Sequence, residues 1–66
     1  MLWVSELLLQ HHDVESFAEL AHIVEERAHA GEMFLRMDVK PPFSDTPENW
    51  EEQLEAAFTG ARPAEP

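Results

Sequence analysis

SFAELAHIVEERAHAG, residues 16–31, is the most informative stretch of the chain, because it shows both the start and the spacing of an amphipathic helix. Ser16 and Glu19 form the pattern of a capping box, and Asp13 is a second candidate for the N-cap. Apolar residues then recur at steps of three and four, the period of a helix. They are Phe17, Leu20, Ala21, Val24 and Ala28. We expect these residues to form the buried face of a central helix.

Gly31 is a candidate end for this helix, since glycine readily adopts the left-handed conformation found just after helix C-termini. The segment from Met33 to Val39 then has two interpretations. It comes close to the alternation of a strand, yet several of its residues are good helix formers. We favour one long helix over residues 14–37, bent or weakened at Gly31. The alternative strand would require pairing with another chain.

Two further helices are expected, one before the central helix and one after it. Residues 2–10 are apolar on most sides, which is typical of a helix buried against something else. Residues 47–59 follow Thr46, an N-cap candidate, and precede Gly60, which is expected to stop the helix. The proline pair at 41–42 predicts an extended linker before this last helix, because proline restricts both itself and the residue before it.

The predicted fold class is all-α, a small bundle or helical hairpin of two to three helices with an extended Pro-Pro linker. We assign residues 1–60 to one small acidic helical domain and residues 61–66 to a disordered C-terminal tail. A domain of 66 residues is marginally stable, and without cysteine it has no disulfide or thiolate metal site to strengthen it. Self-association, a larger partner or a histidine/carboxylate metal site would supply further stability.

The charge of the chain narrows the function classes. Fourteen acidic residues against four basic ones give a net charge of −10, which repels nucleic acid. We therefore expect no direct nucleic-acid binding and interpret the charge mainly as a means of solubility. The alternative is a nucleic-acid mimic that inhibits a DNA- or RNA-binding machine. The sequence shows neither a signal-peptide pattern nor about 20 consecutive apolar residues, so we expect a cytoplasmic protein without membrane contact.

A stripe of histidine and glutamate runs along the central helix at steps of three and four. It includes His22, Glu26 and His29, whose spacing suits a divalent metal. Residues 26–29 also resemble the Glu-x-x-His pair of ferritin-like di-iron bundles, a match of four residues that assigns no family. Because the stripe lies opposite the expected buried face, we favour a hydrated helix surface and expect no cofactor. A metal-binding assembly through these three residues is the alternative.

Large apolar side chains are numerous for so small a core, and several of these residue types are enriched at binding hot spots. The chain has no glycine-rich phosphate loop, and its Ser and Thr residues sit at helix ends or in the linker, so we expect no enzyme. Our leading hypothesis is a protein-binding module, an accessory subunit, adaptor or inhibitor that docks on a larger protein or self-associates. The candidate partner-binding residues are Trp3, Phe34, Phe43, Trp50, Leu54 and Phe58. Of these, Leu54 and Phe58 are expected to contribute to the core as well.

Overall fold

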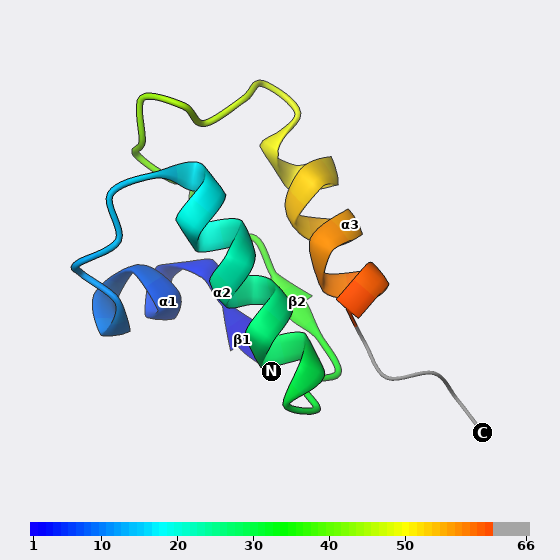
Figure 1. The fold of residues 1–66 in the computed structure, drawn as a ribbon. Helices are drawn as coiled ribbons and strands as arrows, with labels where there is room; N and C mark the ends of the chain where they lie inside the picture. Colours follow the sequence, from blue (N-terminus) through cyan, green and yellow to red (C-terminus); the bar gives the residue numbers. More distant parts are fainter. Residues whose placement is uncertain (62–66) are drawn as a thin grey trace.

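The computed structural model describes residues 1–61, which form three helices and one two-stranded sheet (Figure 1). The elements follow in the order β1 (Leu2–Trp3), α1 (Val4–Gln10), α2 (Phe17–His29), β2 (Leu35–Arg36) and α3 (Trp50–Ala61). The expectation of a small helical fold is confirmed. The sheet is the feature that the all-α prediction missed.

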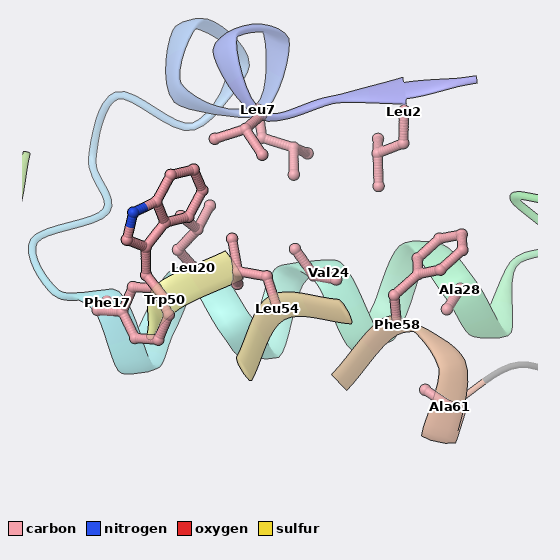
Figure 2. Close-up of a cluster of buried hydrophobic side chains, with 11 residues drawn as sticks. Leu2, Leu7, Phe17, Leu20, Val24, Ala28, Trp50, Leu54, Phe58 and Ala61 are labelled. Atoms are coloured by element: carbon pink, nitrogen blue, oxygen red, sulfur yellow. The ribbon is translucent and has the colours of Figure 1, made fainter. Parts of the chain in front are cut away.

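One hydrophobic core joins α2 and α3 to the N-terminal elements (Figure 2). Side chains of α2 and α3 point toward Leu2 of β1 and Leu7 of α1 in this view. The buried apolar residues are Leu2, Val4, Leu7, Phe17, Leu20, Val24, Ala28, Trp50, Leu54, Phe58 and Ala61. The predicted buried face of α2 is confirmed, with Ala21 half-buried at its edge. Within residues 1–61 no side-chain nitrogen or oxygen is buried without a hydrogen-bond partner, so the core is apolar and closed.

Helix α2 begins at Phe17 rather than at residue 14. Its N-cap is Ser16, whose Oγ accepts a hydrogen bond from the Glu19 N–H at 3.1 Å. The Ser16 hydroxyl also donates to Glu19 Oε1 at 3.3 Å, so the two residues predicted as a capping box do contact each other at the helix start. Asp13 lies in the turn that precedes the helix. Its expected role as N-cap is therefore wrong.

Helix α2 ends at His29, and Gly31 is the cause. Gly31 has a φ of 108°, in the left-handed region that favours glycine. Its N–H donates to the Ala28 carbonyl at 3.1 Å, and the Glu32 N–H donates to the Arg27 carbonyl at 3.2 Å. These two bonds form a Schellman motif, which satisfies the last carbonyls of the helix and turns the chain away from its axis. The predicted continuation of this helix to residue 37 is therefore wrong.

The segment that follows the Schellman motif is extended and pairs with the start of the same chain. β2 runs parallel to β1, with Leu2 opposite Leu35, and the Leu2 N–H donates to the Phe34 carbonyl at 2.8 Å. The strand alternative in the sequence was thus the correct one, but its partner is not another chain. Because Leu2 and Trp3 belong to β1, α1 begins at Val4 rather than at residue 2.

Side-chain burial explains why residues 33–37 are extended despite their helix propensity. Leu35 and Met37 are half-buried against the core, whereas Phe34 and Arg36 are exposed. This period of two fits a strand that covers the core with one face. A helix continuing past Gly31 would carry these apolar residues away from the core, so tertiary packing overrides local propensity.

The linker ends later than predicted. Thr46 does not cap α3: its Oγ1 donates to the Pro41 carbonyl at 3.0 Å and accepts the Phe43 N–H at 3.3 Å, which closes a turn inside the linker. The last helix accordingly begins at Trp50 and not at residue 47. It also continues through Gly60 to Ala61, which is buried and does not belong to a tail. The rest of the predicted tail, residues 62–66, lies outside the described residues.

Two aspartates in the linker between β2 and α3 bind the N-terminal ends of α1 and α2. The carboxylate of Asp45 accepts the N–H groups of Phe17 and Ala18 at 2.7 and 3.3 Å, and Asp38 Oδ1 accepts the Ser5 N–H at 3.1 Å. The bond from Phe17 lowers the pKa of Asp45, and hydrogen bonding from Ser5 lowers that of Asp38. Each carboxylate also faces the positive end of a helix dipole. The linker is thereby fixed across α1 and α2.

The Asp45 bonds make a stability prediction that depends on pH. A carboxyl group whose pKa falls on folding stabilises the fold above its unfolded pKa, and this contribution disappears as pH falls through the folded pKa. We expect Asp45→Asn to lower the melting temperature at about pH 7, and the difference from the parent chain to shrink as pH falls through the folded pKa of Asp45. Circular dichroism melts measure both. Asp13→Asn is the matched control, and an equal loss in that variant would contradict the role given to Asp45.

The two glycines provide a second prediction, because Gly31 has a positive φ whereas Gly60 lies within helix α3. A Cβ would meet no atom within 4 Å at either Gly31 or Gly60, so steric contacts with the rest of the chain do not decide the outcome. Gly31→Ala should destabilise the fold by about 1–2 kcal/mol, since an L-residue is strained at positive φ. Gly60→Ala lies inside α3 and should stabilise it by about 0.5–1 kcal/mol. Urea denaturation measures both; equal effects would show that Gly31 does not end the helix in this way.

Candidate functional site

The main candidate site is an open groove between the β2 segment and α3, with a volume of about 380 Å³. We call it the β2–α3 groove. Its lining residues are Met33, Phe34, Leu35 and Met37 on one side and Glu55, Phe58 and Thr59 on the other. Most of these residues are apolar, but the surface they expose inside the groove is more polar than apolar, so the groove offers a ligand both apolar and polar contacts.

Two neighbouring side chains of this groove are unusually exposed for their type. Phe34 is 62% exposed and Met33 is 55% exposed. Both precede β2 directly, where the chain leaves the Schellman motif and enters the strand. Single exposed apolar residues are ordinary on a protein surface, whereas adjacent ones beside a groove are typical of a binding site.

The charged wall of the groove is acidic. Glu55 lines it, and Glu51 and Glu52 lie one turn earlier on the exposed side of α3. Neither α3 nor the groove lining contains a lysine or arginine. The nearest basic residue of the strand, Arg36, places its guanidinium over the Trp3 ring at 5.5 Å from the centroid, outside the groove lining. Electrostatics at the groove therefore favour a positively charged ligand.

The structure separates the six predicted partner-binding residues into three groups. Trp50, Leu54 and Phe58 are buried in the core, and Leu54 is 0% exposed. Replacing any of these three is therefore foremost a test of folding, although Phe58 also lines the groove. Trp3 and Phe43 are half-buried, and only Phe34 is largely exposed.

Met33, which faces the same groove as Phe34, was missed as a partner-binding candidate. The alternation of residues 33–37 would place Met33 on the inward face with Leu35 and Met37, so the sequence pattern does not predict its exposure. Glu55 was missed because the approach of α3 to residues 33–37 is a tertiary contact that no local pattern reports.

The histidine/glutamate stripe lies on the exposed side of α2. His22 Nε2 and Glu26 Oε1 are 3.7 Å apart, and these side chains are 72% and 64% exposed. His22 Nδ1 is also 3.7 Å from Glu25 Oε1, an ordinary surface pairing of neighbours on a helix. Among the residues that the structure describes, no three His, Cys, Asp or Glu side chains form a group that holds a metal. His22 and Glu26 are thus adjacent, but His29 does not complete a ligand set with them.

Comparison with known proteins adds no assignment. No family model, curated protein sequence or solved structure matches the chain. None of the helices within residues 1–61 combines the length and the apolar character needed to cross a membrane.

Proposed function

We propose that the chain is a small protein-binding module that docks on a larger protein through the β2–α3 groove. The observation that carries this proposal is the exposure of Phe34 beside Met33 on the rim of the groove. Burying a side chain of this size against a partner contributes roughly 1.5–3 kcal/mol. Aromatic residues that enter a pocket or groove commonly dominate the energy of an interface.

The core does not include the Phe34 side chain. The described core is closed by eleven other residues, and Phe34 is not among those packed against it. The exposed Phe34 side chain is a cost in water unless something covers it. A partner surface is the covering that the leading sequence hypothesis already predicts.

The other hypotheses receive less support. The nucleic-acid mimic still rests on the net charge, and the metal-binding assembly would need ligands from more than one copy of the chain. Neither makes use of the exposed Phe34. A non-enzymatic role, a cytoplasmic location and the absence of direct nucleic-acid binding stay predictions from composition.

A paired substitution tests the docking proposal. Phe34→Ser together with Met33→Ser should abolish capture of the partner from a lysate of the source cells, because the apolar contacts of the groove rim are removed. The melting temperature should stay close to that of the parent chain, since both side chains are largely exposed. Quantitative mass spectrometry of the captured proteins provides the measurement.

The matched control is Leu9→Ser, which removes an apolar side chain that is 78% exposed on α1 and does not line the groove. This variant should capture the partner as the parent chain does. Undiminished capture by the Phe34/Met33 double variant would show that the groove is not the docking surface.

A further inference from the structure

One edge of β2 is not paired with β1. With Leu2 opposite Leu35, the parallel ladder uses the carbonyl of Phe34 and the N–H of Arg36 on the β1 side. The N–H and C=O of Leu35 therefore point to the opposite edge. No hydrogen bond within residues 1–61 uses either group. An edge of this kind can accept a further strand.

The unused edge of β2 lies toward α3. β2 is drawn between β1 and α3 in Figure 1, and Leu35 lines the β2–α3 groove together with α3 residues. An extended segment that enters the groove would thus lie alongside Leu35 and within reach of its backbone groups. The same segment would contact the exposed side chains of Met33 and Phe34.

The side chains around this edge define the chemistry of the occupant. Phe34 and Met37 offer apolar contacts, and Glu55 provides the charge of the lining. Glu51 and Glu52 extend that charge along α3. Successive side chains of a strand point to opposite faces, so a strand that alternates apolar and basic residues can satisfy the apolar contacts and the acidic wall at once.

A second copy of this chain is a poor occupant on charge grounds. Each copy has a net charge of −10, and pairing two β2 edges would bring two acidic α3 helices into the same region. Such an arrangement places like charges together, which opposes association. A partner segment with positive charge has the opposite electrostatics.

We infer that the occupant of the β2–α3 groove is an extended segment of alternating apolar and basic residues, which adds a strand to the free edge of β2. This inference rests on the proposed function and specifies its binding mode. Backbone hydrogen bonds to Leu35 hold the segment in register. Contacts with Phe34 and Glu55 select its side chains.

Synthetic peptides test the binding mode with the full chain. The probe is a fluorescein-labelled peptide of about ten alternating lysine and valine residues, the length of a long strand. One control peptide replaces lysine with glutamate, and another gathers the lysines at one end. A third control is N-methylated at two adjacent central residues, which removes a hydrogen-bond donor from each edge of the peptide strand. Fluorescence anisotropy should show the alternating peptide binding at least about fivefold more tightly than the N-methylated one, corresponding to about one backbone hydrogen bond. The other two controls should also bind more weakly.

Charge reversal on the protein provides the matched pair of variants. Glu55→Lys should weaken binding of the alternating lysine peptide several-fold and raise affinity for the glutamate peptide. Glu15→Lys makes the same charge change at an exposed residue outside the groove and should alter binding much less. Equal effects of the two variants would mean that net charge alone attracts the peptide, which would overturn the inference.

The outcomes separate this inference from the proposed function. Equal binding of the N-methylated and alternating peptides overturns strand addition, and self-association of the chain that is lost in Phe34→Ser overturns the choice of occupant. In both cases partner capture that depends on Phe34 and Met33 would leave the docking proposal standing. If neither capture nor peptide binding depends on Phe34, the docking proposal falls as well.

Discussion

The left-handed backbone of Gly31 is the constraint on which the rest of the structure depends. With a φ of 108° it ends α2 in a Schellman motif and turns the chain back toward its own N-terminus. Only after that turn can Leu35 lie opposite Leu2 and close the sheet. The same turn leaves Phe34 on the surface beside α3, so the end of a helix and the position of the groove have one physical origin.

The acidic linker fixes the geometry that the turn creates. Asp38 binds the start of α1 and Asp45 binds the start of α2, so both ends of the linker are tied to helices that precede it in the chain. α3 is thereby returned to the side of α2, where Leu54 and Phe58 complete the core. Part of the acidic charge thus has a structural role, while the glutamates of α3 remain exposed.

Local patterns predicted the helix face and the capping pair but not the long-range contacts. Phe17, Leu20 and Val24 were identified because a buried helix face has a fixed period. The strand was misjudged because residues 33–37 satisfy two patterns, and its partner is residues 2–3 at the far end of the chain. The groove could not be predicted for the same reason. It exists only where β2 and α3 approach each other, and Phe34 acquires its significance from that approach.

Residue-resolved amide hydrogen exchange tests the central claim most directly, because it reports on each edge of β2 separately. In the free chain the Arg36 N–H, which faces β1, should exchange slowly, and the Leu35 N–H, which faces the groove, should exchange fast. Adding the alternating lysine and valine peptide should slow exchange at Leu35 and leave Arg36 nearly unchanged. Protection of Leu35 in the free chain, or no response to the bound peptide, would contradict the account.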